Sequence, residues 1–413
     1  MTTNDITVVG GFYGEECSYP PRVLYRGSGG RAASTLRGLG ASVKLVTSVG
    51  PSLNDAAVEI AKQRGFELRA TSKAADVWFH YAHPLAAPSI SNSGSKNVQK
   101  ASPIEAEFSL VFGMLEGRPP VRARRAVYDP QDGSAAKPYW ADGSTALELA
   151  LVLSFSEGVA LSGATQPSEI VESLLKGENV AAVILKCGPQ GALVAIQKEK
   201  HWIRAFPTDR VYKVGSGDVF SAAFSYAWLL QKESVLASAW FASRTVAYYV
   251  ESSDDTMLGI GVEALWQGAR AAQSSMTDSA ARPVPDTQIY LAGPFFSTAQ
   301  RWLVDEARAA LMDMGFKVFS PVHDVGMGSC DEVVQKDLEA LDKSGIVMAL
   351  ADGMDPGTIF EIGYARSKGI PVVIVAESAK ETDLTMMFGA DCAVLNDFAT
   401  GIYFTCWKLM GDV

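Results

Sequence analysis

The segment Asp-Pro-Gly-Thr-Ile-Phe-Glu-Ile-Gly-Tyr-Ala, residues 355–365, says most about the architecture of this chain. Apolar runs at residues 346–351 and 370–375 stand on either side of it. The order predicts a strand, a loop, a helix and a second strand, which is the repeating unit of a parallel sheet. We expect Thr358 to cap the start of the helix and Gly369 to end it, so that Glu361 lies in the first helical turn.

Two acidic side chains in this segment are candidates for chemistry. Glu361 would lie beyond the carboxyl end of a strand, where ligands of open α/β sheets bind, and the helix dipole would favour its ionised form. Such a carboxylate can attack a sugar anomeric carbon. Asp355 would deliver a proton to the leaving base or orient Glu361. The simpler alternatives are a dipole partner for Glu361 and a turn residue for Asp355.

The residues that follow the apolar run 289–292 predict one wall of the same site. Gly293 and Pro294 indicate a tight loop, and Phe296 would stack on a nucleobase or pack in the core against a helix over residues 298–314. Ser297 would hold a 5′-phosphate or simply cap that helix.

A helix is also predicted over residues 333–341, where Val334, Leu338 and Leu341 have helical spacing. Asp337 would point away from this apolar stripe. It is therefore either a ligand of the base or sugar, or part of a solvated helix face.

Together these residues resemble the nucleoside 2-deoxyribosyltransferase family over residues 287–410. The resemblance implies that Glu361 is the nucleophile and that Asp355 and Asp337 share its pocket. Residues 384–389, which include Met386, are similar to that family's C-terminal segment. The family implies a small Rossmann-like (flavodoxin-like) parallel-sheet domain, no cofactor, and a homo-oligomer that hydrolyses or exchanges the base of a nucleoside or nucleotide.

Length and composition predict a multidomain α/β protein. A chain of 413 residues is too long for one ordinary core. Residues 268–286 are small, polar and proline-containing, and we interpret them as a linker between domains at 1–267 and 287–413. Both parts alternate short apolar runs with amphipathic stretches.

Charge and cysteine usage exclude several classes of function. The formal net charge of −10 argues against nucleic acid as a partner. No run of 18 apolar residues predicts a membrane span, and the polar N-terminus does not read as a secretory signal. The five scattered cysteines are typical of free thiols in a reducing compartment, so we expect a cytoplasmic protein.

In the N-terminal part, the strongest local signal is Gly215-Ser216-Gly217-Asp218, which precedes an apolar helix predicted over residues 221–230. Glycines at a helix start free backbone N–H groups to bind phosphate oxygens. Asp218 could take the proton of a hydroxyl that attacks a phosphoryl group. A plain turn with a helix cap explains the same residues.

Together with a Gly-Gly segment at 29–41 and a strand and glycine-rich turn at 183–192, these residues resemble the PfkB, or ribokinase-like, family of sugar and nucleoside kinases over residues 5–265. The resemblance implies a ribokinase-like α/β sandwich that uses ATP and Mg²⁺, with Asp218 as the catalytic base. It assigns these residues to the nucleotide: Gly215, Ser216, Gly217, Gly188 and Gly191. Glu157 matches the glutamate near the magnesium ion.

The sequence departs from that family at the sugar site. Ser34 stands where an asparagine is usual, no aspartate follows the first strand, and residues 212–214 replace the usual run before the glycines. Two hypotheses follow. The chain is a bifunctional enzyme, with an ATP-dependent sugar or nucleoside kinase joined to a glycosidic-bond enzyme, or its first domain is a nucleotide-sensing pseudokinase that regulates the second.

Overall fold

The computed structural model describes residues 5–93, 102–275, 284–326 and 330–413. The chain divides into two compact units. One consists of residues up to 208 and 212–282, and the other of residues 209–211 and 283–413. Among the described residues, no helix has the length and apolar character needed to cross a membrane.

The C-terminal unit is built on a five-stranded parallel sheet with the spatial order β15-β14-β16-β17-β18. In chain order this is 2-1-3-4-5, the flavodoxin-like arrangement that the sequence predicted. The strands alternate with helices and are almost wholly apolar, because both faces of the sheet are covered. Their bounds are β14 (Gln288–Ala292), β15 (Lys317–Phe319), β16 (Ser344–Leu350), β17 (Val372–Val375) and β18 (Ala393–Leu395).

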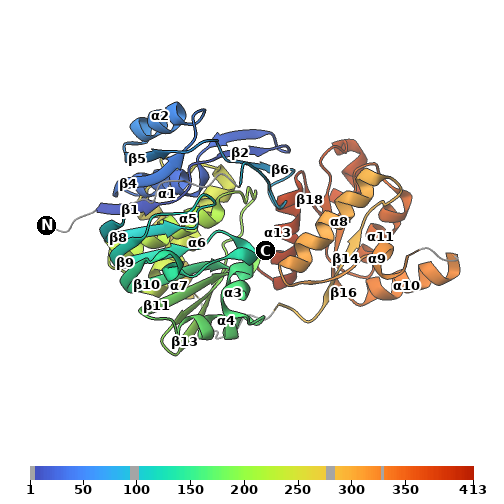
Figure 1. Ribbon diagram of the computed structural model, residues 1–413. Helices are drawn as coiled ribbons and strands as arrows, with labels where there is room; N and C mark the ends of the chain where they lie inside the picture. The colour runs from blue at the N-terminus through green and yellow to red at the C-terminus, as the bar shows by residue number, and fades with distance from the viewer. Residues whose placement is uncertain (1–4, 94–101, 276–283, 327–329) are drawn as a thin grey trace. The chain divides into compact units, whose positions relative to one another are not determined.

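Helices cover both faces of this sheet (Figure 1). Helices α8 (Thr298–Asp313) and α13 (Phe398–Met410) contact each other on one face, and α11 (Pro356–Ser367) packs against β14, β16 and β17 on the other. The remaining helices are α9 (Pro321–Asp324), α10 (Cys330–Asp342) and α12 (Thr385–Gly389). Strand order reverses between β14 and β16, so the carboxyl ends of these two strands form the point where ligands of such sheets bind.

The start of α11 differs from the prediction. Asp355, and not Thr358, is the N-cap, because Pro356 occupies the first helical position. Glu361 is therefore the sixth residue of the helix and lies in its second turn. The predicted end is confirmed, since Gly369 has a left-handed φ of 74° just after the helix.

The N-terminal unit contains a nine-stranded sheet with the order β13-β12-β11-β10-β9-β8-β1-β4-β5. Pairing is parallel from β5 to β11 and antiparallel among β11, β12 and β13. The strands are β1 (Asp5–Val9), β4 (Ser42–Val49), β5 (Glu67–Ser72), β8 (Ile104–Phe112), β9 (Val121–Asp129), β10 (Thr145–Ser154), β11 (Val180–Lys186), β12 (Ala192–Ile196) and β13 (Glu199–Ile203).

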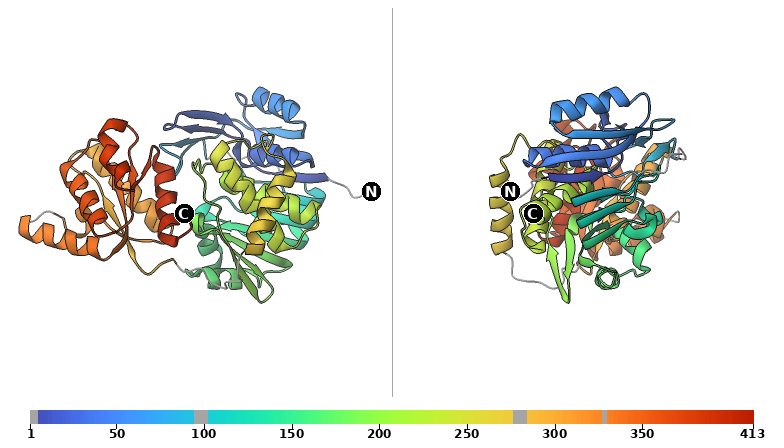
Figure 2. Two further views of the ribbon diagram at one scale, coloured as in Figure 1. Left: turned by 180° about the vertical axis from the view of Figure 1, so that it is seen from behind. Right: turned by 60° about the vertical axis from the view of Figure 1, so that its left-hand side comes forward.

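A second, four-stranded sheet of order β3-β2-β6-β7 belongs to the same unit. Helices α5, α6 and α7, yellow-green to gold in Figure 2, lie together on one face of the large sheet. The small sheet comprises β2 (Gly14–Cys17), β3 (Arg22–Tyr25), β6 (Trp78–Tyr81) and β7 (Ser89–Ser91). The helices are α1 (Gly27–Gly38), α2 (Asn54–Arg64), α3 (Phe155–Ser162), α4 (Pro167–Leu174), α5 (Ser216–Ser225), α6 (Val235–Ser252) and α7 (Val262–Ser275).

The predicted linker overlaps regular structure. Helix α7 runs to Ser275, so the first part of the range 268–286 is helical. Residues 276–283 of that range lie outside the described residues. The helix after the glycines also starts earlier than predicted, at Ser216, which places Asp218 in its first turn.

Candidate functional site

In the C-terminal unit, the carboxylate of Glu361 is held by a tyrosine from the neighbouring strand. Tyr290 is fully buried on β14, and its ring stacks on Phe319 of β15 with centroids 5.5 Å apart. The Tyr290 hydroxyl donates a hydrogen bond of 2.5 Å to Oε1 of Glu361. The two side chains meet at the switch point between β14 and β16, so the sheet itself positions the carboxylate.

Burial dominates the protonation behaviour of this pair. It raises the pKa of Glu361 to about 7, while the Tyr290 hydrogen bond opposes the shift and the charges of Asp337 and Asp355 add to it. Burial and the adjacent Glu361 also raise the pKa of the Tyr290 hydroxyl, which therefore stays protonated and donates. A helix dipole acts mainly on the first turn, and Glu361 lies beyond it. The helix dipole therefore does not stabilise the ionised form of Glu361 as the sequence predicted, and burial makes this carboxyl group harder to ionise.

Asp355 caps the N-terminus of α11. Its Oδ2 accepts hydrogen bonds from the backbone N–H of Thr358 at 2.8 Å and from the Thr358 hydroxyl at 3.1 Å. This is the geometry of an N-cap carboxylate. Asp355 is nonetheless close enough to raise the pKa of Glu361 by its charge.

Asp337 is partly covered on its helix. Its Oδ1 atom is buried and accepts no hydrogen bond from any described residue. Burial raises the pKa of Asp337 to about 6, and its charge in turn raises the pKa of Glu361. The expected apolar stripe is only partly buried, because Leu341 is fully covered while Val334 is half exposed. Buried polar atoms usually have hydrogen-bond partners, so Oδ1 of Asp337 is a candidate acceptor for a donor group of a ligand.

The four other predicted substrate residues have different surroundings. Phe296 is 74% exposed, so the core-packing alternative is wrong for this ring. Ser297 is the N-cap of α8, in a capping box with Gln300. A Cβ on Gly293 would lie 3.2 Å from Leu350, so the loop passes close to β16. Met386 on α12 is 82% exposed.

In the N-terminal unit, Asp218 lies in the first turn of α5 after Gly215, whose φ is 82°. Arg31 of α1 donates a hydrogen bond of 2.5 Å to its Oδ2, and Gln131 donates one of 2.9 Å to its Oδ1. Arg31 is 1% exposed and also forms an ion pair with Glu15 of β2. The sequence analysis missed this partner, although an arginine directly after Gly29-Gly30 was the signal.

A second group of charges surrounds Asp129 at the end of β9. Its Oδ2 accepts hydrogen bonds from the ammonium of Lys186 and the hydroxyl of Ser221, both at 2.7 Å. The predicted metal residue, Glu157, accepts a hydrogen bond of 2.7 Å from the Ser154 N–H in a capping box. Burial raises the pKa of Glu157, and the charge of Asp129 adds to this shift.

These residues do not fit a bound magnesium ion. Within the described ranges, no three His, Cys, Asp or Glu side chains are grouped so as to hold a metal. The carboxylates that would form such a group already have partners within the chain, as the Asp129–Lys186 pair shows.

Local backbone geometry accounts for glycine at the positions that the sequence assigned to nucleotide binding. Gly188 and Gly191 have φ values of 57° and 96° around a short 3₁₀ turn. A Cβ on Gly191 would lie 1.9 Å from the carbonyl oxygen of Ile203, so only glycine fits there. Ser216 and Gly217 begin α5.

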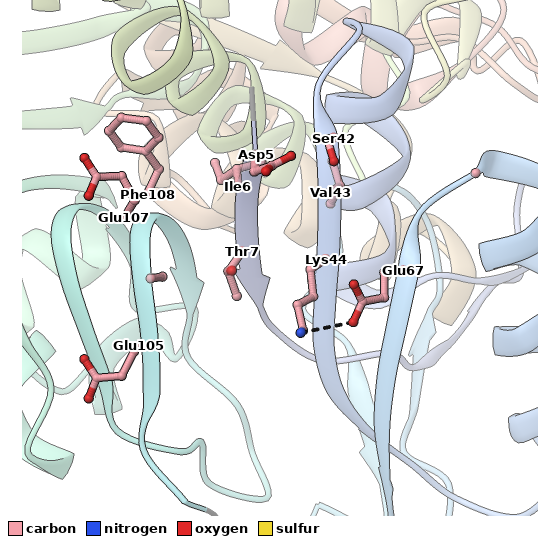
Figure 3. Close-up of a pocket in the computed structure, with 12 residues that line it drawn as sticks. Asp5, Ile6, Thr7, Ser42, Val43, Lys44, Glu67, Glu105, Glu107 and Phe108 are labelled. Carbon is pink, nitrogen blue, oxygen red and sulfur yellow. Dashed lines mark ion pairs between the residues drawn. The ribbon is translucent and has the colours of Figure 1, made fainter. Parts of the chain in front are cut away.

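A hollow of about 460 Å³ lies elsewhere on the N-terminal unit, lined by the amino ends of β1, β4, β5 and β8 (Figure 3). Asp5, Glu67, Glu105 and Glu107 give it acidic walls, and its Lys44 is paired with Glu67 at 3.0 Å. Ligands of such sheets bind at the carboxyl ends of the strands, so this hollow is not the predicted site.

Two family models match the chain. Residues 129–257 match the pfkB family of carbohydrate kinases, and residues 289–398 match nucleoside 2-deoxyribosyltransferase. No curated protein matches the chain. The chain thus joins a PfkB-type, ribokinase-like domain to a nucleoside 2-deoxyribosyltransferase-like domain, as the sequence predicted.

Several solved structures similar to the chain are kinases, among them a ribokinase, a nucleoside kinase and a fructokinase. A fructokinase double mutant from Vibrio cholerae, with fructose, ADP and potassium bound, is 12% identical, with a TM-score of 0.52, 65% of this chain covered and 99% of that one. A nucleoside kinase from Methanocaldococcus jannaschii is 14% identical with a TM-score of 0.49, and a ribokinase from Thermotoga maritima is 18% identical with a TM-score of 0.45; the covered shares are again 65% and 99%. At 12% identity, the similarity of this chain to the fructokinase concerns the fold alone.

Proposed function

We propose that the C-terminal domain breaks or exchanges the N-glycosidic bond of a nucleoside or nucleotide. The observation that carries the proposal is the Glu361 carboxylate, held by Tyr290 at the switch point of a flavodoxin-like sheet. Among the described residues none donates a hydrogen bond to Oε2, the second oxygen of Glu361. That oxygen is available to attack an anomeric carbon.

The reaction we propose has two steps. The ionised Oε2 of Glu361 forms a bond to the anomeric carbon while the bond to the base breaks, and the base leaves with a proton. Water or a second base then attacks the same carbon and releases Glu361, and the proton that the attacking molecule loses returns to the acid that protonated the leaving base. Of the two neighbouring acids, Asp337 suits proton donation better, because its raised pKa keeps it protonated more often near neutral pH. Asp355, engaged as an N-cap, suits the positioning of α11.

The remaining substrate assignments follow from exposure. Phe296 and Met386 offer exposed apolar side chains for a nucleobase, and the start of α8 at Ser297 suits a 5′-phosphate. Gly293 lets the loop pass close to β16. A homo-oligomer without a cofactor in this domain, as the family resemblance implies, completes the proposal.

For the N-terminal domain we propose that the turn before α5 binds a nucleotide, as the pfkB match suggests. Two forms of this proposal remain distinct. In one, the domain transfers phosphate from ATP with Mg²⁺ to a sugar or nucleoside, with Asp218 as base. In the other, it senses a nucleotide and regulates the glycosidic reaction. The poor fit of the acidic residues to a metal ion favours the second.

The test is a screen for released base. Deoxyribonucleosides, ribonucleosides and their 5′-monophosphates are incubated with the full chain, with and without ATP, and free base is measured by chromatography. We expect Glu361→Gln to keep the fold and to lose activity by several orders of magnitude, as when other nucleophiles are removed. A variant that cleaves at the normal rate would show that Glu361 is not the nucleophile.

A further inference from the structure

Two cations of the chain itself occupy the centre where phosphoryl transfer would take place. Arg31 lies between Glu15 and Asp218, and Lys186 contacts Asp129. All come from the carboxyl ends of the strands or from the elements that follow them, so they share the edge of the sheet where a substrate would bind.

The first consequence concerns Asp218 as a base. A general base must come within hydrogen-bond distance of the acceptor hydroxyl. Both oxygens of Asp218 already accept hydrogen bonds, from Arg31 and from Gln131. An acceptor would have to displace the exposed Gln131 from Oδ1 or the buried Arg31, which is 1% exposed, from Oδ2. On the Oδ2 side this is costly, because removing one partner of a buried ion pair is strongly destabilising.

The second consequence concerns Gly215. A Cβ at this position would lie 2.2 Å from Cζ of Arg31. The first glycine of the Gly-Ser-Gly turn therefore makes room for the guanidinium, independently of any phosphate. The backbone before α5 is shaped around Arg31.

The third consequence concerns the metal ion. Phosphoryl transfer requires a cation that neutralises the phosphate charge. The ammonium of Lys186 bonds to Asp129 and lies 3.4 Å from the place of a Cβ on Gly217, at the start of α5. Burial opposes the charge on Lys186, but Asp129 and Glu157 outweigh it and raise its pKa, so it stays charged.

We propose that Arg31 and Lys186 are internal cations that take the places of the acceptor hydroxyl and the metal ion, so that Asp218 is a structural anion and the domain does not transfer phosphate. This inference rests on the proposal that the turn before α5 is a nucleotide-handling site and decides between its two forms. It is independent of the reaction proposed for Glu361.

Thermal unfolding of full-length variants tests the role of Arg31. Arg31→Met leaves two buried carboxylates without their cation, and we expect its midpoint to fall by about 10 °C. The triple variant Glu15→Gln, Arg31→Met and Asp218→Asn carries no charge at these positions and should regain at least half of the loss. The control is Arg124→Met, which removes an exposed arginine paired with Glu107 and should leave the midpoint unchanged.

Unchanged midpoints in both Arg31→Met and Asp218→Asn would overturn the proposal. If Arg31→Met does not fold, the triple variant still decides, because internal neutralisation predicts that it folds. A triple variant as unstable as Arg31→Met would also contradict it.

Two measurements on the wild-type chain address the chemistry. Transfer of ³²P from γ-labelled ATP with Mg²⁺ is measured for pentoses, hexoses and nucleosides, and binding of Mn²⁺ is followed by electron paramagnetic resonance. We expect no transfer of phosphate to any acceptor. We also expect the wild-type chain and Asp129→Asn to bind Mn²⁺ to the same extent. Transfer that Asp218→Asn abolishes, or a Mn²⁺ site that Asp129→Asn removes, would show that the centre is an ordinary metal-dependent kinase site.

Discussion

The hydroxyl of Tyr290 donates a hydrogen bond of 2.5 Å to Oε1 of Glu361. The tyrosine lies on the first strand of the C-terminal sheet and the glutamate on the helix after the third, β16, so the bond spans the switch point. It fixes one oxygen of the carboxylate, and no described residue donates a hydrogen bond to the other. The same burial that orders the pair raises the pKa of Glu361 to about 7.

The raised pKa makes Glu361 a source of instability at alkaline pH. A carboxyl whose pKa is higher in the folded state than in the unfolded state holds its proton more tightly when folded, so stability falls as pH rises from about 4.5 to 7. Glu361→Gln removes this cost. At pH 8 we expect the variant to be more stable than wild type by about 1–3 kcal/mol, and at pH 4 to be no more stable.

Chemical denaturation at the two pH values measures the difference. The matched control is Glu339→Gln on α10, an exposed carboxyl that should change stability by little at either pH. Equal stabilities of Glu361→Gln and wild type at pH 8 would contradict the raised pKa.

The hydrogen bond from Tyr290 lowers the pKa of Glu361 against the effect of burial. Tyr290→Phe should therefore move the acid limb of kcat/KM to higher pH by about one unit, the size of a shift expected from one lost hydrogen bond to a charged group. Activity at pH 7 should fall, because less of Glu361 is ionised there. Tyr364→Phe is the control, because that tyrosine on the same helix bonds to Asp342. An unchanged pH profile in Tyr290→Phe would show that the bond does not tune the nucleophile.

Much of the C-terminal site could be predicted because its residues lie close together in sequence. Asp355 and Glu361 are on one helix, and apolar runs marked the strands around it. The Tyr290–Glu361 bond could not be predicted in the same way, because it joins residues 71 positions apart and depends on the register of β14 against β16. Local capping rules also failed at Thr358, where Pro356 started the helix earlier.

The N-terminal centre shows the same limit more strongly. The glycine turn and Asp218 were visible as a motif, but the Arg31–Asp218 pair joins residues 187 positions apart. Sequence alone presented Asp218 as a carboxylate awaiting a substrate. Only the packing of α1 against α5 shows that the chain supplies its partner.

Two variants separate the capping role of Asp355 from a catalytic one. Asparagine caps helices as well as aspartate does, whereas alanine does not. We expect Asp355→Asn to keep wild-type stability and to retain activity within about tenfold, since it loses only a charge near Glu361. Asp355→Ala should lose about 1 kcal/mol of stability. Denaturation and base release are measured for both. A loss of activity in Asp355→Asn as large as that in Glu361→Gln would identify Asp355 as the proton donor instead.

The C-terminal domain carries its own core, so we expect a fragment of residues 284–413 to fold by itself. Its strands and the helices α10, α11 and α12 bury a shared apolar cluster that includes Leu341, Ile362 and Ile374. A chain of this size suffices for an independent core. The fragment should unfold cooperatively, with near-UV circular dichroism of a packed structure. Exposed Phe296 and Met386 suit completion of the pocket by a second copy, so base release per molecule should rise with fragment concentration. An insoluble or molten fragment would instead mean that the ribokinase-like domain is needed for folding, and coupling between the two domains would then become the reason for their fusion.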